Sequence, residues 1–317
     1  MKIFGITLAI ALTATASAWP QVPPDIAARL RTIGPAVDPA ATAAIYRPLH
    51  RKAPYPGVTV TRDISYGPDP RQLIDVFAPA LTIARPPAVP PVVTAPPVAP
   101  PAVPAVPAAA PAIAAPRPVL VFVSGGAGNK IERVPDGDAF YDNVMLWAVK
   151  NGMTGVNVQR LGGTDGGLAA ANDVALVIQW IQQNIARYSG DPNRVFIWAH
   201  SSGTGPVAAY VASPETPEHK GHGLDGAVLM GASSAILPPA VAAAVRKTGV
   251  PLFVGAGEID VPGAVVWVAA VSEETCDATC PTTMLFRDHS HMSAVFSPNT
   301  ADDSVTGPIL KWMSSVK

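Results

Sequence analysis

From residue 118 to the carboxyl end, short apolar runs alternate with helix-like segments, and this alternation constrains the fold more than any other feature. The expected strands cover residues 119–123, 154–158, 195–199, 226–230, 251–255 and 283–286. The expected helices cover residues 139–150, 206–212, 239–247 and 264–271, a segment with apolar side chains at Val174, Val177, Ile181 and Ile185, and a last helix from Pro308. Strands that are apolar throughout are buried on both faces. The pattern predicts an α/β fold, with a mostly parallel sheet and helices on both faces.

A stretch at residues 86–118 is built almost entirely from Pro, Ala and Val. It holds 13 Pro, 11 Ala and 6 Val in 33 positions. Such a segment cannot bury a core, and it favours extended, solvated polyproline-II structure. The preceding residues 19–85 contain only two weakly helical segments, at 25–33 and 39–49, and two strand-like runs, at 57–65 and 72–77. That is too little for an independent core. We therefore expect residues 19–317 to form a single domain, interrupted by a disordered insertion at 86–118.

Residues 1–18 have the pattern of a signal peptide. Lys2 gives a positive start, Ile3–Leu12 is a short apolar run, and Ala16-Ser17-Ala18 fits a small-residue cleavage site. A membrane anchor is the alternative, but the run is shorter than the roughly 20 residues that span a bilayer. We expect an exported protein, periplasmic or secreted, that begins at Trp19 and has no stable membrane insertion.

The net charge bears on nucleic-acid binding, and the two cysteines bear on a disulfide or a metal site. The net charge of −1 gives no basic surface for nucleic acid. Cys276 and Cys280 are the two cysteines, and in an oxidising compartment we expect them to form a small local disulfide. A metal site is an alternative because His289 and His291 follow closely, but the spacing matches no common zinc pattern. Two free thiols are the third possibility.

Ser201 lies where the expected strand 195–199 passes into the expected helix 206–212. A strand, a turn of small residues and a helix form the context of a nucleophile elbow. The residues two before and two after the serine must be small, because strand and helix pass close together there. Ala199 and Gly203 satisfy this requirement. Ser202 is the rival hydroxyl, but choosing it places bulkier residues at the two small positions.

The glycine-rich loop Ser124–Gly128 follows the expected strand 119–123. A dinucleotide-binding fingerprint would need a glycine where Ile131 stands, and a phosphate-binding P-loop would need Gly-Lys where Lys130-Ile131 stands. Both motifs therefore fail. We interpret the loop as one whose backbone N–H groups approach a substrate and stabilise an oxyanion, with a plain turn as the alternative.

A serine nucleophile needs a base and a group that orients the base. Asp260 follows the expected strand 251–255 and is the predicted orienting carboxylate, with Glu258 as its competitor. His289 and His291 follow the next expected strand, so either one completes the chain order Ser, Asp, His. We favour His291 as the base. His200 adjoins the serine, and we expect its side chain to point away from it along the strand.

The chain resembles the α/β-hydrolase carboxylesterases, in the branch near kynurenine formamidase and bacterial feruloyl-esterase-like proteins. The resemblance covers residue 58 to the carboxyl end, apart from the insertion. The matching stretches are 66–77 (YGPDPRQLIDVF), 119–126 (VLVFVSGG), 140–144 (FYDNV), 151–157 (NGMTGVN), 186–195 (ARYSGDPNRV), 200–203 (HSSG), 257–260 (GEID) and 289–293 (HSHMS). The family's Tyr-Arg-Leu appears here as Gln159-Arg160-Leu161.

The resemblance implies an α/β-hydrolase fold and a serine carboxylic-ester hydrolase that acts on a small-molecule ester through an acyl-enzyme, without metal or cofactor. It implies a nucleophile, an orienting acid and a base at Ser201, Asp260 and His291, and oxyanion-binding N–H groups at Gly125, Gly126 and Ser202. An amide or formamide hydrolase with the same triad is the alternative function. A binding protein on the same scaffold, without catalysis, is the second alternative.

Overall fold

The structure, a computed structural model, describes residues 21–80, 115–134, 139–161, 168–213, 220–275 and 280–316. The predicted signal peptide, nearly all of the predicted insertion, and Cys276 lie outside these ranges. The signal peptide, the disorder of the insertion and the Cys276–Cys280 disulfide therefore stay predictions.

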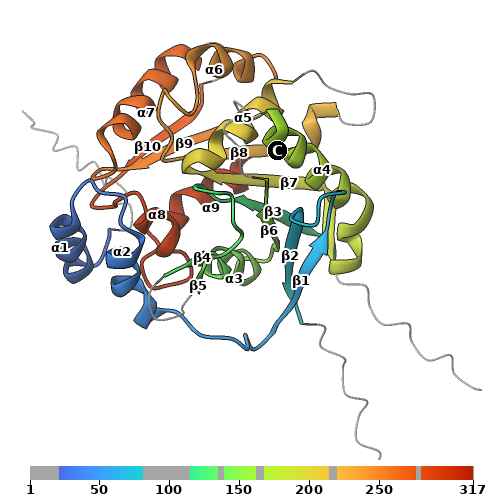
Figure 1. Ribbon diagram of the computed structural model, residues 1–317, viewed down its shortest axis with the longest axis horizontal. Helices are drawn as coiled ribbons and strands as arrows, with labels where there is room; N and C mark the ends of the chain where they lie inside the picture. Colours follow the sequence, from blue (N-terminus) through green and yellow to red (C-terminus); the bar gives the residue numbers. More distant parts are fainter. Residues whose placement is uncertain are drawn as a thin grey trace, which may run out of the picture.

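An eight-stranded sheet forms the centre of the described part of the chain (Figure 1). Its spatial order is β1 (Val58–Ser65), β2 (Leu73–Pro79), β6 (Thr154–Gln159), β3 (Arg117–Val123), β7 (Gly190–His200), β8 (Gly226–Met230), β9 (Leu252–Gly257) and β10 (Thr282–Phe286). Strand β2 runs antiparallel to both β1 and β6, and each later pair from β6 to β10 is parallel. The sheet is mostly parallel, as predicted, and the two early strands belong to it.

Helices cover both faces of this sheet (Figure 1). One face carries α4 (Leu168–Asn184), α5 (Thr204–Ala212), α6 (Pro239–Arg246) and α7 (Pro262–Thr275). The other carries α1 (Pro24–Ile33), α2 (Pro39–Tyr46), α3 (Asp142–Lys150), α8 (Ser293–Phe296) and α9 (Thr306–Ser315). Short 3-10 helices are η1 (Arg47–Leu49), η3 (Ile185–Tyr188), η4 (Ser201–Gly203) and η5 (Lys220–Gly223).

The central strands show why their sequences are apolar throughout. Along β7, Val195 and Ile197 pack under the first helical layer, whereas Phe196 and Trp198 pack under the second. Successive side chains of a strand point to opposite faces, so a strand covered on both faces needs apolar residues at every position. The parallel strands also end at one common edge, and the loops that follow them meet there.

Among the predicted boundaries that differ from the structure, two are informative. Arg117 and Pro118 belong to β3, so the predicted insertion extends two residues too far. The helix expected from Ala139 begins at Asp142, because Tyr141 has a left-handed backbone (φ +86°). Residues 139–140 form the short strand β5 (Ala139–Phe140), which pairs with β4 (Glu132–Arg133). A two-residue strand is too short for any periodicity to show in the sequence.

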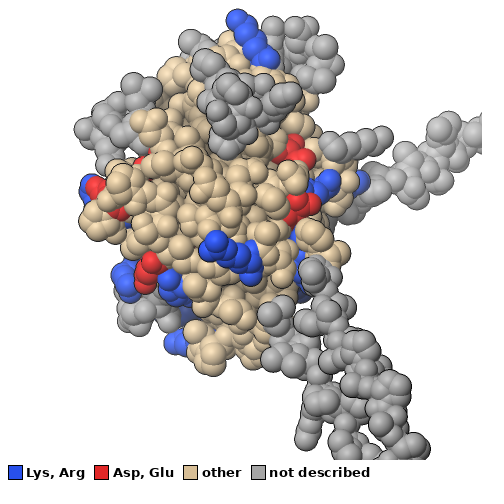
Figure 2. Space-filling view, turned by 90° about the vertical axis from the view of Figure 1, so that its right-hand side faces the viewer, with Lys and Arg blue, Asp and Glu red and all other residues tan. Residues whose placement is uncertain are grey.

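The face shown in Figure 2 carries Lys and Arg side chains interspersed with Asp and Glu, among a majority of uncharged residues. This mixture fits the net charge of −1. No helix within the described ranges combines the length and the apolar character that crossing a membrane requires.

Candidate active site

Ser201 lies at the sharp turn between β7 and α5. Strand β7 ends at His200, η4 begins at Ser201, and α5 begins at Thr204. The Ser201 backbone has φ +54°, a left-handed conformation that costs a residue with a side chain about 1–3 kcal/mol. Such strain is typical of a nucleophile elbow, which holds the serine hydroxyl clear of both strand and helix.

Two glycines let neighbouring segments approach this turn closely. A Cβ atom on Gly203 would lie 2.5 Å from the carbonyl oxygen of Ser124 and 2.6 Å from that of Val123. A Cβ atom on Gly125 would lie 2.5 Å from the Cβ of Ser201. Neither position accepts a side chain at these distances. The glycine-rich loop therefore lies directly against the predicted nucleophile.

Asp260 and His291 form a buried hydrogen-bonded pair on the loops that follow β9 and β10. His291 Nδ1 lies 2.7 Å from Asp260 Oδ1, which also accepts a 2.6 Å hydrogen bond from the Val261 N–H. Because an ionised carboxylate can only accept, His291 donates from Nδ1, and Nε2 of the neutral ring is left as an acceptor. This is the arrangement of a general base and its orienting carboxylate.

His200 connects this pair to the serine turn. Its ring centroid lies 4.6 Å from that of His291, and its Nε2 hydrogen-bonds the His291 carbonyl oxygen at 3.0 Å. Burial, and secondarily the nearby His291, hold the pKa of His200 well below its usual range. The sequence predicted only that His200 points away from Ser201, and it gave no sign of this contact. No hydrogen bond joins the Ser201 hydroxyl to His291 among the described residues.

The two competing residues have other partners. Glu258 is exposed and accepts a 3.0 Å hydrogen bond from the Asp288 N–H. His289 is fully buried, with Nδ1 2.9 Å from Ser293 Oγ and Nε2 2.7 Å from Ser304 Oγ. Burial lowers the pKa of His289 to about 4. Both of its ring nitrogens are engaged, so none is left to accept a proton from a serine.

The predicted oxyanion-binding residues lie together around the serine turn. Gly126 has φ +55°, and its carbonyl oxygen accepts a 3.1 Å hydrogen bond from Ser202 Oγ. The Gly125 carbonyl oxygen accepts a 3.0 Å hydrogen bond from the Gly128 N–H. Arg160 was assigned no role from the sequence, yet its Nη2 lies 3.3 Å from both the Gly126 carbonyl oxygen and Ser202 Oγ.

Of the residues considered for a metal site, Cys276 lies outside the described ranges. These ranges contain no group of three or more His, Cys, Asp or Glu side chains that could hold a metal ion. His289 and His291, the two histidines considered for it, bond to two serines and to Asp260 respectively.

Part of the chain is similar to known proteins. Residues 105–249 match the model of the Carboxylesterase family. This match includes the serine turn and the glycine-rich loop but ends before Asp260 and His291. Among curated proteins, the chain is 33% identical to human cocaine esterase over 134 residues, which are 39% of this chain and 22% of the relative. The chain thus spans about a fifth of the length of that relative.

Solved structures of esterases cover nearly the whole chain. A thermostable esterase from Pseudomonas putida superposes with a TM-score of 0.56 at 13% identity, over 95% of this chain and 99% of that one. An α/β-hydrolase enzyme from a deep-sea metagenome library gives a TM-score of 0.52 at 10% identity, over 83% and 99%. The predicted α/β-hydrolase fold is therefore confirmed.

Proposed function

We propose that this protein is an exported serine carboxylic-ester hydrolase, with Ser201 as nucleophile, His291 as base and Asp260 as orienting acid. The observation that carries the proposal is the buried His291–Asp260 pair, hydrogen-bonded at 2.7 Å, with the His291 ring 4.6 Å from the ring of His200, the residue before the strained Ser201. The match to the Carboxylesterase family supports the same reaction class.

The first half-reaction forms the acyl-enzyme. His291 Nε2 takes the hydroxyl proton of Ser201 while the serine oxygen bonds to the ester carbonyl carbon. Asp260 keeps the imidazole in the tautomer that leaves Nε2 unprotonated, and it stabilises the imidazolium that forms. The tetrahedral intermediate then collapses, the alkoxy group leaves, and the imidazolium returns the proton to it as the alcohol departs.

The second half-reaction releases the acid. Water attacks the acyl-enzyme carbonyl, gives one proton to His291 and expels the Ser201 oxygen, which recovers that proton. In both halves the negative carbonyl oxygen needs hydrogen-bond donors, and we assign this role to the N–H groups of Gly125, Gly126 and Ser202. The two half-reactions together need only ester and water.

A panel of chromogenic esters with increasing acyl length, tested on the purified protein, addresses the reaction class. Wild type should hydrolyse short esters, and a fluorophosphonate should label it once, at Ser201. Ser201→Ala should abolish hydrolysis and labelling without a loss of thermal stability. Ser314→Ala, which removes an exposed hydroxyl bonded only to the Leu310 carbonyl, is the matched control. A label on Ser202, or full activity in Ser201→Ala, would refute the assignment.

The substrate branch is a finer part of the proposal. The motif resemblance points to a feruloyl-esterase-like or kynurenine-formamidase-like enzyme, and a formamide differs from an ester only in the leaving group. Adding feruloyl esters and N-formyl aromatic amines to the panel separates these two possibilities. A protein that binds these compounds, but neither hydrolyses them nor reacts with fluorophosphonate, would instead be a binding protein on this scaffold.

Export is proposed from residues 1–18 alone. Expression of the full chain in a bacterium should yield a periplasmic or secreted protein whose first residue is Trp19. A protein that stays in the cytoplasm with Met1 intact would contradict it. The same sample tests the Cys276–Cys280 disulfide, because thiol labelling before and after reduction counts free cysteines directly.

A further inference from the structure

Arg160 places a buried guanidinium behind the oxyanion loop. It directly follows strand β6, and only 6% of its surface is exposed. Its Nη2 lies within hydrogen-bonding distance of three oxygens: the Ser124 carbonyl at 3.5 Å, the Gly126 carbonyl at 3.3 Å and Ser202 Oγ at 3.3 Å. One side chain thus contacts both the glycine-rich loop and the residue after the predicted nucleophile.

These contacts bear on the direction of the N–H groups of the loop. In a planar trans peptide unit the C=O and N–H bonds point in opposite directions. The Ser124 carbonyl shares its peptide unit with the Gly125 N–H, so the bond from Arg160 turns that N–H away from the guanidinium. The Gly126 N–H shares its unit with the Gly125 carbonyl, which is held by the Gly128 N–H at 3.0 Å.

Gly128 completes the arrangement. Its carbonyl accepts a 2.9 Å hydrogen bond from the Arg160 backbone N–H, and its φ is +79°. A Cβ atom there would lie 2.4 Å from Arg160 Cγ. The last glycine of the loop is therefore required so that the arginine side chain can pass. The two oxyanion donors predicted in this loop are thus oriented by Arg160 and Gly128 together.

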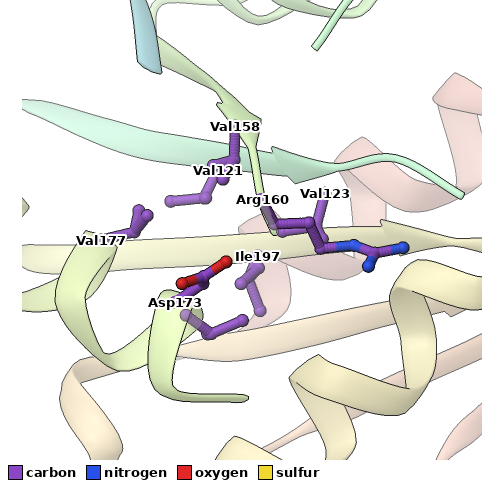
Figure 3. Close-up of a pocket in the computed structure, with 8 residues that line it drawn as sticks. Val121, Val123, Val158, Arg160, Asp173, Val177 and Ile197 are labelled. Carbon is purple, nitrogen blue, oxygen red and sulfur yellow. The ribbon is translucent and has the colours of Figure 1, made fainter. Parts of the chain in front are cut away.

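The Arg160 guanidinium lies in a buried position. No carboxylate of the described residues lies within 4 Å of its guanidinium. Asp173 is engaged by the Gln72 side chain at 2.6 Å and the Leu161 N–H at 2.5 Å. Figure 3 shows the guanidinium extending away from the Asp173 carboxylate. Burial lowers the pKa of Arg160, against the opposing influence of Asp173.

We propose that Arg160 is the positioning residue of the oxyanion hole, which fixes the N–H donors of the loop and adds a buried positive charge behind them. This inference rests on the proposed function. A preorganised charge of this kind favours the transition state over bound ester, because negative charge develops on the carbonyl oxygen only as the serine attacks. Removing the guanidinium should therefore lower kcat more than it changes KM.

Steady-state kinetics on a short 4-nitrophenyl ester test this inference with Arg160→Gln, Arg160→Lys and the matched control Arg194→Gln. Arg194 is a second arginine that donates to a backbone carbonyl, that of Val316, at 3.3 Å. Losing one direct oxyanion donor costs about 10²–10³-fold in kcat, so loss of a positioning residue should cost less. Arg160→Gln should lower kcat about 10- to 100-fold, with KM within about 3-fold of wild type. The kcat of Arg160→Lys should lie between those of Arg160→Gln and wild type. Arg194→Gln should match wild type in both constants.

Binding of a trifluoromethyl ketone separates positioning from a general loss of structure. This compound forms a tetrahedral oxyanion adduct with a serine, so its affinity should fall by the same factor as kcat/KM. Gly128→Ala keeps the guanidinium but displaces it, and it should reproduce the loss of kcat if Arg160→Gln does not fold.

The outcomes separate this inference from the function on which it rests. An active wild type, with Arg160→Gln and Gly128→Ala retaining both kcat and ketone affinity, overturns the role of Arg160 alone. A loss that appears only in KM, or that follows thermal stability across the variants, also overturns it. A wild type that neither hydrolyses esters nor reacts with fluorophosphonate overturns the proposed function, and this inference with it.

Discussion

Two polar clusters lie on either side of one short loop and differ in how completely their groups are paired. The His289 cluster consists of Tyr46, His289, Ser293, Asp302 and Ser304. In it, both ring nitrogens and both carboxylate oxygens have partners, at distances between 2.5 and 3.0 Å. It joins helix α2 near the beginning of the described chain to the loops around α8.

The base cluster consists of Ser201, Asp260, His291 and His200. Asp260 Oδ2 and His200 Nδ1 are buried without a hydrogen-bond partner among the described residues, and Ser201 has a strained backbone. Buried polar groups in proteins are nearly always paired, and strain persists only where the surrounding structure enforces it. We therefore expect the fully paired cluster to stabilise the fold, and the incompletely paired cluster to act in the proposed reaction.

The largest effect should come from replacing each histidine of the loop in turn. His291→Ala should lower kcat/KM about 10⁴-fold or more, with little change in thermal stability, because it removes the base. His289→Ala should keep kcat/KM within about 10-fold of wild type but lower the free energy of unfolding by about 1–3 kcal/mol, because it leaves buried serine hydroxyls unpaired. Esterase assays and urea unfolding on both variants check this. Loss of catalysis in His289→Ala alone would reverse the assignment.

Replacing Asp260 or Asp302, one aspartate from each cluster, should separate activity from stability in the same way. Asp260→Asn should lower kcat by about 10⁴-fold, because an amide stabilises the wrong tautomer of the base, and it should melt close to wild type. Asp302→Asn should retain most activity but lose about 1–3 kcal/mol of stability. Its amide NH2 group replaces one carboxylate oxygen and would face a hydroxyl that now donates to Asp302, either that of Tyr46 or that of Ser304. If both variants lose activity equally at a temperature where they are folded, the clusters are not functionally distinct.

The features that could be predicted from the sequence depend on residues close together in the chain or on the order of the strands. Apolar runs placed the strands, and the small residues around Ser201 identified the turn. The positions of Asp260 and His291 after successive strands placed them at one sheet edge. Each of these signals lies within a few residues, or follows from the topology of a parallel sheet.

The sequence could not predict contacts between distant residues. His200 and His291 are 91 positions apart. They meet because His200 lies on the same face of β7 as Phe196 and Trp198, and the loop before α8 packs on that face. Arg160 and the glycine-rich loop meet because β6 and β3 are neighbours in the sheet. Complete pairing of the His289 cluster likewise depends on Tyr46, which packing brings to Asp302 across 256 positions.

The pH dependence of stability offers a smaller test. The pKa of His289 is about 4 in the folded chain and about 6.5 when unfolded. Between these values the unfolded chain binds more protons, so the free energy of unfolding should fall as pH falls, by up to about 1.4 kcal/mol per pH unit. Burial lowers the pKa of His50 and His200 too, and these act in the same direction. Urea unfolding from pH 7 to 4 should show a shallower slope for His289→Gln, and an unchanged slope would contradict this.

Deleting residues 87–116 should have the smallest effect, because this range includes no residue of either cluster. Phe77 near the end of β2 and Leu120 in β3 both pair with Gly155 of β6, so they lie two strand spacings apart, about 10 Å. A short Gly/Ser turn can bridge a gap of this size, whereas the 30 deleted residues would extend about 90 Å as polyproline II. Closing a long loop costs only slightly more entropy than closing a short one, so removing it should stabilise the fold slightly if at all.

We therefore expect the deletion variant to keep the esterase activity and the melting temperature of wild type, and the His289→Ala and His291→Ala phenotypes should be unchanged in its background. The reason is that β1 and β2 complete the sheet through β6, and the end of β2 lies near the start of β3. A genuine interdomain linker would behave differently, because residues 19–85 would then fold when expressed alone. A stable 19–85 fragment, or a deletion variant that fails to fold, would show that the chain is divided into two domains at this segment.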